Sequence, residues 1–385
     1  MKTLVTGSTG FIGGHLTRAL VAAGREVRCL VRPFSDTSSL LDTPAIELVC
    51  ADLEDGESIR TCLRDVDVVY HVAVDYSRPS VEPVRALTEG ARTAKLRRFV
   101  FVSSIAVTGP ADGGQAVTEE TPCAPRNDYA RAKVAGEEAV REAHARDGLP
   151  AVILRPTAVY GPGEVNFWLP LFRGVAGGRL PLFGDGSNRL NLCFVENLVE
   201  GALLAETSDR AVGETYVISD GQPYPFDEVV RMMARACGAP SPRRRIPGRY
   251  AAPVAQVLDY LWRLELMEPI IPFLSANVRQ WMADYACSVD KATRELGYPA
   301  RVGLQEGIER TVAWYRQNGY LHSTEPWCEG ILDAPPVVEA AGRWRRSLAA
   351  AGHAALIAGR VGALTWKLPP RLSRKMRRRW GWVRA

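Results

Sequence analysis

The chain has 385 residues, of which 46% are hydrophobic and 24% are charged, a composition that is ordinary for a globular protein. No stretch stays apolar over the roughly 18 residues that a membrane-spanning helix needs, so such a helix is not expected. The first residues lead directly into a strand-like segment, so a signal peptide is not expected.

Short β-branched segments alternate with amphipathic segments through the first half of the chain. Strands are predicted in chain order at Lys2–Thr6, Glu26–Val31, Ile46–Cys50, Val66–Val72, Arg98–Ser103 and Ala151–Arg155. Helices are predicted between them at Gly13–Ala23, Glu57–Leu63, Val81–Ala94 and Tyr129–Ala145. This alternation predicts an α/β fold of the Rossmann type, in which a doubly wound parallel sheet carries helices on both faces.

Beyond Tyr160 the chain becomes richer in Gly, Pro and aromatic residues. We interpret residues 1–161 as a dinucleotide-binding core and residues 162–330 mainly as a smaller substrate-binding region. Two strands, Leu190–Val195 and Thr215–Ile218, are expected to return from that region and complete the sheet. Ligands of such sheets bind at the carboxyl ends of the strands.

The net charge of +5 and the cysteines bear on partners and compartment. Residues 334–385 contain 12 Lys and Arg against one acidic residue, Glu339, and carry +11, which leaves −6 for residues 1–333. The eight cysteines are scattered, without a C-x-x-C pair or a Cys/His cluster. We expect reduced structural thiols in a cytoplasmic protein, with neither disulfides nor a metal site.

The segment TGSTGFIG places Gly7, Gly10 and Gly13 between the first strand and the first helix. Glycines there let the backbone turn sharply and approach a pyrophosphate, whose charge is stabilised at a helix N-terminus. A glycine turn without a ligand is the alternative, but the strand–turn–helix context favours a dinucleotide. The residues beside these glycines are expected to contribute: Thr9, Phe11 and Ile12.

The end of the second strand indicates which dinucleotide binds. An acidic residue there accepts hydrogen bonds from the adenosine ribose of NAD, whereas a basic residue favours the 2′-phosphate of NADP. Val31 stands where the acid is expected and Arg32 follows it, which favours NADP, although Asp36 leaves NAD open. Asp52, after the third strand, is placed either to hydrogen-bond the adenine amine or to cap the next helix.

Tyr129 and Lys133 are four residues apart and therefore lie on one face of a helix. A phenol with the ordinary pKa of ~10 exchanges protons poorly at neutral pH, but a neighbouring ammonium stabilises the phenolate and lowers that pKa. Ser103 and Ser104 end an apolar strand about 25 residues earlier. A serine in that place is suited to hydrogen-bond the reacting oxygen beside the phenol.

The segments TGSTGFIG, FVFVSSIAVTG, YARAK and LRPTAVYGPG follow one another in this order. Together they resemble the extended short-chain dehydrogenase/reductase family, also called the NAD-dependent epimerase/dehydratase superfamily, over about residues 1–320. The resemblance implies that Ser104 rather than Ser103 is the catalytic serine. It implies that Tyr129 is the general acid/base and that Lys133 holds the nicotinamide ribose and lowers the pKa of Tyr129. Further cofactor contacts are implied for Leu53, Val72, Ala73, Pro156 and Val159.

Two departures from the family pattern bear on function. The usual N-V-x-G-T helix start is replaced by Ser80-Val81-Glu82-Pro83-Val84, so backbone support behind the site is expected to differ while the chemistry remains. In sugar-nucleotide members, an arginine of an R-D pair binds the substrate diphosphate. Here Arg189 stands one position early, which turns its side chain to the other face of a strand. This shift weakens the epimerase and dehydratase interpretation.

Three segments look like the 3β-hydroxysteroid dehydrogenase branch of the family, part of whose pattern dihydroflavonol-reductase-like members share. They are LNLCFVENLVEGALLA, the apolar Pro-bounded stretch Ala251–Leu274, and a segment resembling a helical hairpin that ends near Tyr320. We therefore expect an NADP-dependent oxidoreductase, with NAD possible, that interconverts a secondary alcohol and a ketone on a sterol, terpenoid or polyketide-like substrate. The apolar side chains of that stretch alternatively form core: Trp262, Leu264, Leu266 and Phe273.

Residues 331–385 are interpreted as a basic helical tail that contains Trp344, Trp366, Trp380 and Trp382. Such a tail is suited to an anionic membrane surface, which would make the protein peripherally membrane-associated. Docking to a partner is an equal alternative, and nucleic acid is not expected because no recognisable motif accompanies the charge.

Two rival hypotheses for the whole protein stay open. One is a sugar-nucleotide epimerase or dehydratase that retains NAD, and the other is a non-catalytic regulatory protein that binds the dinucleotide. A homodimer is expected, since Val81–Ala94 and Tyr129–Ala145 resemble helices that pair in family dimers.

Overall fold

The structure is a computed structural model, which describes residues 1–321 apart from residues 39, 41–42, 54, 77, 112–113, 179, 264–277 and 279–281. The chain divides into two units, Met1–Pro326 and Trp327–Ala385, and all described residues belong to the first. The predicted basic tail therefore lies outside the described residues. So do residues 264–274 of the apolar stretch Ala251–Leu274, with Leu264, Leu266 and Phe273, and the side chain of Trp262.

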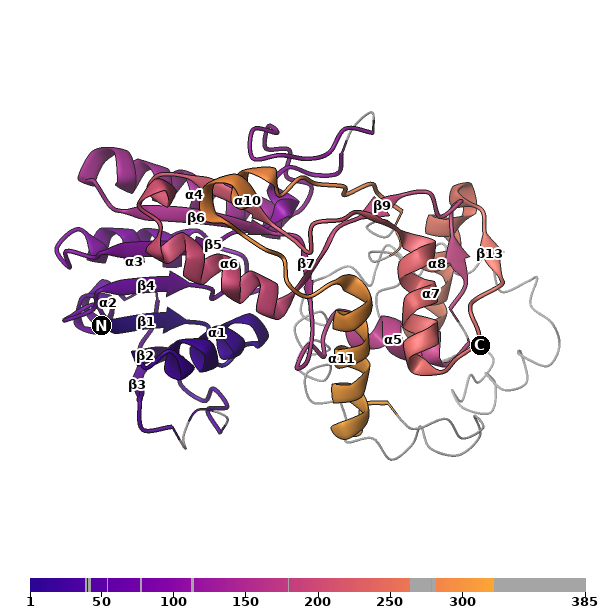
Figure 1. Cartoon of the computed structure of the whole chain (residues 1–385), viewed down its shortest axis with the longest axis horizontal. Coiled ribbons are helices and arrows are strands. Elements are labelled where there is room, and N and C mark those ends of the chain that lie inside the picture. The colour runs from indigo at the N-terminus through magenta and orange to yellow at the C-terminus, as the bar shows by residue number, and fades with distance from the viewer. Residues whose placement is uncertain are drawn as a thin grey trace, which may run out of the picture. The chain divides into compact units, whose positions relative to one another are not determined.

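A seven-stranded sheet forms the centre of the first unit (Figure 1). Its strands, in spatial order, are β11 (Thr215–Ile218), β6 (Ala151–Pro156), β5 (Arg98–Val102), β4 (Val68–His71), β1 (Lys2–Thr6), β2 (Glu26–Val31) and β3 (Ile46–Cys50). All neighbouring pairs are parallel. The strand order reverses between β1 and β4, which is where doubly wound sheets bind ligands at their carboxyl ends. The predicted fold class is confirmed.

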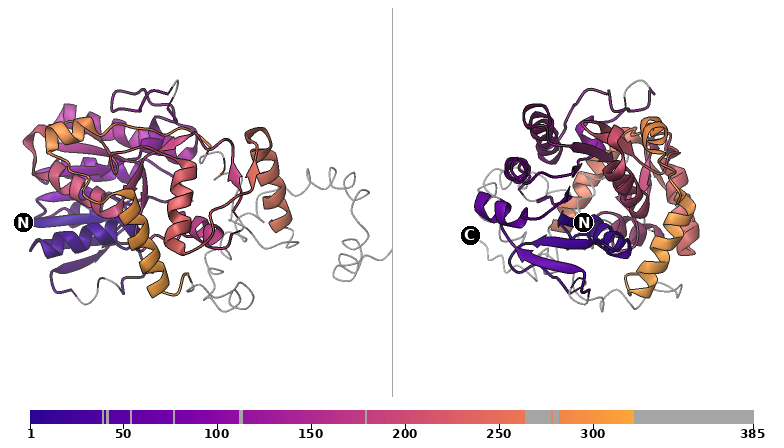
Figure 2. Two further views of the ribbon diagram at one scale, coloured as in Figure 1. Left: turned by 45° about the vertical axis from the view of Figure 1, so that its right-hand side comes forward. Right: turned by 60° about the vertical axis from the view of Figure 1, so that its left-hand side comes forward.

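Helices cover both faces of this sheet, as Figures 1 and 2 show from three directions. One face carries α2 (Gly56–Cys62), α3 (Glu82–Ala91) and α4 (Asp128–Asp147). The other carries α1 (Phe11–Ala22), α6 (Val195–Thr207) and α10 (Asp290–Leu296). Successive strand residues point to opposite faces, so Leu4 enters the first core and Val5 the second, and both are fully buried. Both faces of the sheet are therefore shielded from solvent.

A separate core, away from the large sheet, lies in the region after residue 160. It includes side chains of α5 (Trp168–Ala176), α7 (Phe226–Cys237), α8 (Gly248–Arg263) and α11 (Leu304–Gln317). Three short sheets accompany these helices: β7 (Ala158–Tyr160) with β10 (Leu192–Phe194), β9 (Arg189–Leu190) with β12 (Tyr224–Pro225), and β8 (Leu182–Phe183) with β13 (Arg245–Ile246). Two short 3-10 helices, η1 (Ile105–Val107) and η2 (Asp209–Ala211), complete the described elements.

The predicted strand Leu190–Val195 is wrong as a single element of the large sheet. The segment contains the last residue of β9 and the whole of β10, and these two strands pair in different small sheets. The helix α6 begins at Val195. Asn191 separates the two strands, because its buried amide oxygen accepts a hydrogen bond from Cys287 N at 2.9 Å and its amide nitrogen donates to Ser219 Oγ at 3.2 Å. The other predicted returning strand, Thr215–Ile218, does join the large sheet as β11.

One contact links α1 to the loop that follows β7. His15 Nε2 lies 2.7 Å from the carbonyl oxygen of Pro162, and because a carbonyl only accepts, the ring nitrogen donates. Burial lowers the pKa of His15, so the imidazole is neutral at physiological pH. This hydrogen bond therefore connects the N-terminal half of α1 to the beginning of the predicted substrate-binding region.

Within the described part of the chain, no helix combines the length and the apolar character required to span a membrane. The seven cysteines in that part are unpaired, and five of them are buried. No group of three or more His, Cys, Asp or Glu side chains among these residues is arranged to hold a metal ion.

Candidate active site

The glycine turn lies between the carboxyl end of β1 and the N-terminus of α1. Gly7 has a φ of +74°, and a Cβ there would lie 2.8 Å from the backbone nitrogen of Ala73. A Cβ at Gly13 would lie 2.1 Å from the carbonyl oxygen of Gly7, so neither position accepts a side chain. Gly10 is the N-cap of α1, makes no side-chain cap, and is followed by no acidic residue in the first turn. The helix N-terminus therefore suits an anionic group.

A hydrogen-bonded corner at the end of β4 supports the glycine turn. Thr6 Oγ1 accepts hydrogen bonds from Val72 N and Ala73 N, both at 3.2 Å, and its own proton is directed to His71 Nδ1 at 2.8 Å. Burial, with the nearby charge of Lys133, lowers the pKa of His71 to about 3, so this imidazole is neutral. The corner places the predicted contacts Val72 and Ala73 directly against Gly7.

Arg32 follows β2, as the sequence predicts. Its side chain is 72% exposed, and Nη1 lies 3.6 Å from Asp75 Oδ2 in the loop between β4 and α3. Asp36, the alternative ribose ligand, accepts a hydrogen bond from Ser38 N at 3.0 Å. Arg32 thus stands at the carboxyl end of β2, and its contact with the adenosine ribose stays a prediction.

Asp52 is exposed after the end of β3, beside the half-buried Leu53. The helix-capping role considered for it is wrong, because α2 is capped by Asp55, whose carboxylate accepts hydrogen bonds from Glu57 N and Ser58 N. The chain takes three further residues to turn into the helix, which the sequence pattern did not specify. A contact of Asp52 with adenine stays a prediction.

The nicotinamide side of the expected cofactor site is formed where β6 passes into β7. Pro156 ends β6, and Val159 lies in β7 with its carbonyl oxygen accepting a hydrogen bond from Trp168 Nε1 at 2.9 Å. Between them, Thr157 Oγ1 is buried and makes no hydrogen bond within the described residues. A buried hydroxyl of this kind calls for a polar partner, such as a carboxamide. With the glycine turn and the uncapped helix, the residues present fit a dinucleotide.

Two adjacent serines at the end of β5 point in different directions. Ser104 is the N-cap of η1, and its Oγ accepts a hydrogen bond from Ala106 N at 3.2 Å, while its hydroxyl acts on Tyr129 and lowers the pKa of the phenol. Ser103 turns into the protein and donates to Glu137 Oε1 at 2.6 Å. Because successive residues of an extended chain face opposite sides, only Ser104 stands beside the phenol.

Lys133 lies one turn after Tyr129 on α4. Its Nζ donates a hydrogen bond to the carbonyl oxygen of Val102 at 2.7 Å and lies 6.0 Å from the centroid of the Tyr129 ring. The side chain is buried, and this burial lowers the pKa of Lys133 to about 8, against the opposing charge of Glu137. At neutral pH the amine is therefore a buried ammonium beneath the phenol.

Burial raises the pKa of Tyr129 above its ordinary range, and the neighbouring Tyr76 raises it further, while the hydrogen bond of Ser104 lowers it. The balance is opposite to the predicted lowering by Lys133, whose ammonium donates to the Val102 carbonyl rather than to the phenol. Tyr129 is therefore protonated at neutral pH. In this state it is a proton donor.

Sequence reasoning missed Glu137, which is fully buried on α4 behind Lys133. Its carboxylate accepts hydrogen bonds from Arg155 Nε at 2.9 Å, Arg155 Nη2 at 2.7 Å and Arg141 Nη2 at 2.7 Å, besides that from Ser103. Burial raises the pKa of Glu137, but these donors outweigh it, so the pKa is lowered overall. An acid four residues after Lys133 on the same helix was the available signal.

Tyr76 was also missed. It lies in the loop between β4 and α3, and its ring stacks on that of Tyr129 with 5.2 Å between centroids and 25° between planes. The two phenols interact and shift each other's pKa, and the Tyr76 residue is 69% exposed. An exposed aromatic residue in a loop follows no periodic pattern, so no sequence signal indicated it.

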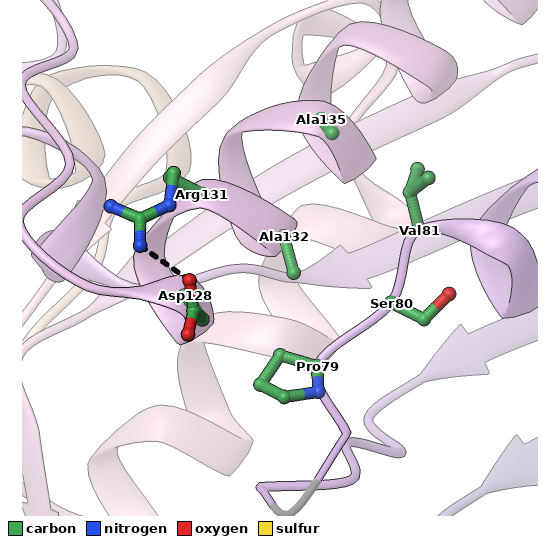
Figure 3. A pocket seen from close by; sticks show the side chains of 7 residues that line it. All are labelled: Pro79, Ser80, Val81, Asp128, Arg131, Ala132 and Ala135. Carbon is green, nitrogen blue, oxygen red and sulfur yellow. Dashed lines mark hydrogen bonds and ion pairs between the residues drawn. The ribbon is translucent and has the colours of Figure 1, made fainter.

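An open groove lies on another face of α4 (Figure 3). It is lined by Pro79, Ser80, Val81, Asp128, Arg131, Ala132 and Ala135, and an ion pair joins Asp128 to Arg131. Ser104, Tyr129 and Lys133 are not among its lining residues. The groove is therefore separate from the candidate site of Ser104, Tyr129 and Lys133.

Arg189, considered as a diphosphate ligand, lies in β9. Its Nε is 3.4 Å from Asp284 Oδ2, and its Nη2 donates to the carbonyl oxygen of Gly114 at 3.0 Å. These partners hold the guanidinium in a structural contact between two loops.

Comparison with known proteins places the chain in a family. Residues 3–219 match the model of the NAD dependent epimerase/dehydratase family. The chain belongs to this family. It is an NAD-dependent oxidoreductase of the extended short-chain dehydrogenase/reductase type, which confirms the predicted family and the prediction of an enzyme over that of a non-catalytic protein.

Individual members of the epimerase/dehydratase family differ in the activities that their names state. The chain is 31% identical to the sterol demethylase protein B of Methylococcus capsulatus, over 83% of this chain and all of that one. It is 28% identical to a 3-beta-hydroxysteroid dehydrogenase of Mycolicibacterium neoaurum, over 82% and 91% of the two chains. A dTDP-glucose 4,6-dehydratase of Streptomyces venezuelae, solved with NAD, is similar in structure with a TM-score of 0.66 and 27% identity, over 83% and 98%.

Proposed function

We propose that this oxidoreductase interconverts a ketone and a secondary alcohol on an apolar, sterol-like substrate, with NADP as its cofactor. The observation that carries the proposal is the placement of Ser104 beside Tyr129, with the ammonium of Lys133 6.0 Å from the centroid of the phenol ring. Two hydroxyl donors beside a buried positive charge suit an oxygen that gains negative charge during reaction.

When bound, NADP supplies or accepts the hydride. The glycine turn and the N-terminus of α1 would hold its pyrophosphate, Arg32 its 2′-phosphate, and the Pro156–Val159 segment its carboxamide. In reduction, Ser104 and Tyr129 donate hydrogen bonds to the substrate carbonyl oxygen, and Tyr129 transfers its proton to the developing alkoxide. The Lys133 ammonium stabilises the phenolate that remains. In oxidation, the phenolate of Tyr129 accepts the proton of the alcohol.

Two observations support an apolar substrate over a sugar nucleotide. Arg189, which would be needed for a diphosphate, is held by Asp284 and by the Gly114 carbonyl. The two sequence relatives above carry names that refer to sterol or steroid chemistry. The preference for NADP is supported by the exposed Arg32, whose 3.6 Å contact with Asp75 leaves donors for a phosphate.

The proposal is tested by mixing the purified protein with NADPH or NADH and either a 3-oxosteroid or dTDP-glucose. We expect NADPH oxidation with the 3-oxosteroid only. Tyr129→Phe should lower kcat by about 10²–10⁴-fold, because the general acid is lost, while nucleotide binding stays nearly unchanged. Tyr250→Phe, at a half-exposed tyrosine of α8, is the matched control.

Two outcomes contradict the proposal. Wild-type turnover by the Tyr129→Phe variant removes the assigned acid. Tightly retained NAD, with conversion of dTDP-glucose and no net cofactor turnover, establishes the epimerase or dehydratase alternative instead.

We further propose that the basic tail binds an anionic membrane surface, as its +11 charge and its tryptophans suggest. Full-length protein should float with vesicles that contain phosphatidylserine and not with neutral phosphatidylcholine vesicles. Replacing Arg377, Arg378 and Arg379 by Glu should weaken this binding by at least tenfold, since each nearby basic residue contributes about 1 kcal/mol. Equal binding to both vesicle types excludes the electrostatic anchor.

A further inference from the structure

We propose that Tyr76 is the proton relay between Tyr129 and solvent. The inference deepens the proposed function and rests on it, because it concerns how the phenol of Tyr129 regains its proton after each reduction. The stacked geometry of the two rings and the unequal exposure of the two tyrosines carry it.

The side of Tyr129 that faces the protein interior offers no direct exchange with water. Lys133 is 6% exposed, and its amine donates to the Val102 carbonyl. His71 is 1% exposed and accepts a hydrogen bond from Thr6. The charge of Lys133 acts on His71, Glu137 follows on α4 behind Lys133, and all three groups are buried. A proton that enters from this side would have to cross buried, hydrogen-bonded groups.

On its other side, Tyr129 contacts the exposed side chain of Tyr76. Tyr76 stacks on Tyr129 at 5.2 Å between ring centroids and 25° between planes, and the two phenols shift each other's pKa. At 69% exposure, Tyr76 touches both the half-buried Tyr129 and bulk water. Two phenols differ little in their intrinsic affinity for a proton, so transfer between them has a small driving force in either direction. A relay requires this reversibility.

The relay leaves both tyrosines unchanged after a complete cycle. In reduction, Tyr129 gives its proton to the alkoxide and becomes a phenolate. The O–H bond of Tyr76 then breaks as its proton moves to the Tyr129 oxygen, and the Tyr76 phenolate takes a proton from water. In oxidation each transfer runs backwards, and the proton of the alcohol leaves to solvent. The proton consumed in reduction therefore comes from solvent.

Two variants distinguish the role of the Tyr76 hydroxyl group from the role of its ring. Tyr76→Phe keeps the stacked ring and removes the relay, whereas Tyr76→Ala removes both. With NADPH and a 3-oxosteroid, Tyr76→Phe should lower kcat by about tenfold and enlarge the solvent deuterium isotope effect, because reprotonation of Tyr129 becomes slow. Imidazole, a small diffusible acid, should restore part of the rate to this variant and leave the wild type unaffected.

Tyr250→Phe is the matched control, since Tyr250 is another well-exposed tyrosine and lies on α8. It should keep the wild-type kcat and isotope effect. The relay is overturned if Tyr76→Phe shows the same kcat, isotope effect and response to imidazole as the wild type. If Tyr129→Phe is inactive in that case, the proposed function survives and only the relay fails.

A second measurement needs no turnover. The ultraviolet absorbance of tyrosinate is titrated with pH in the wild type, in Tyr76→Phe, in Tyr129→Phe and in the double variant. If the two phenols share a hydrogen bond, the changes in the titration are not additive, and the double-variant cycle gives a coupling between them. Additive changes show two independent phenols and overturn the relay.

Discussion

The two sides of Tyr129 are built in opposite ways. Beneath it lies a buried cluster, defined here as Ser103, Lys133, Glu137 and Arg155. Each of these side chains has hydrogen-bond partners and is buried. Above it lies an exposed loop, residues 73–76 and 78–81, which contacts the phenol through Tyr76 and Arg32 through Asp75.

This difference suggests that the buried cluster holds the acid–base residues in place, whereas the exposed loop modifies their rates. Removal of one partner from the buried cluster leaves a charge without compensation in a dry environment, which is costly. The exposed loop has few such constraints, so its side chains can change while the fold remains. Rates, proton exchange and substrate choice are therefore expected to be set by the loop, and the presence of the acid–base pair by the cluster.

The largest expected effect comes from breaking the buried cluster. Glu137→Leu leaves Arg155 without its carboxylate partner and should lower the free energy of unfolding by about 3–5 kcal/mol, measured by urea denaturation. The control is Glu82→Gln, which breaks the exposed Glu82–Arg85 pair on α3 and should cost less than about 1 kcal/mol. Similar losses in both variants would remove the contrast between the two sides.

The next effect is a pH dependence of the cluster. The pKa of Lys133 is lowered to about 8 by burial, so its charge disappears as the pH rises through that value. In reduction, kcat should then fall by up to tenfold per pH unit above about 8, and Lys133→Arg should move this limb upward. A flat profile up to pH 10 in the wild type would contradict the role of the ammonium.

The same group predicts the opposite trend for stability. The folded-state pKa lies below the ordinary value of ~10.4, so between these two pH values the unfolded chain binds more protons than the folded one. The contribution of Lys133 to the free energy of unfolding therefore increases from about pH 8 to the ordinary pKa. It is measured as the difference between the wild type and Lys133→Met across that interval, and a constant difference would contradict it.

The smallest effect concerns Arg32, which contacts Asp75 of the exposed loop. Arg32→Ser should reduce the preference for NADPH over NADH by about tenfold, because one charge-assisted phosphate contact is lost. Arg85→Ser, which removes an exposed arginine of α3, serves as the control and should leave the preference unchanged. If both variants behave like the wild type in kcat/KM for the two cofactors, Arg32 is a surface charge without a role in selection.

Much of the fold is predictable from local sequence signals. The bounds of β1, β2 and β3 agree with the predicted strands, because each is a short β-branched run limited by turn residues. The segment Leu190–Val195 failed for a different reason. Its residues pair with β12 and β7, which lie far away in the sequence, and no local pattern specifies such partners.

The candidate site shows the same division. Gly7, Tyr129 and Lys133 follow spacings that a turn or a helix imposes, so the sequence indicated them. Glu137 shares the helix spacing, but its importance depends on Arg155, which comes from another strand. Tyr76 lies in a loop, and its contact with Tyr129 arises only when β4 and α4 are brought together.

The hydrogen bond from His15 to the Pro162 carbonyl matters for engineering. A chimera that receives the region after residue 160 from a relative would bring a new loop against α1 of this chain. Unless that loop offers an acceptor at the same place, the imidazole of His15 loses its partner in a half-buried site. Grafts that keep the GPG turn of residues 161–163 should therefore express and fold better than grafts joined within it.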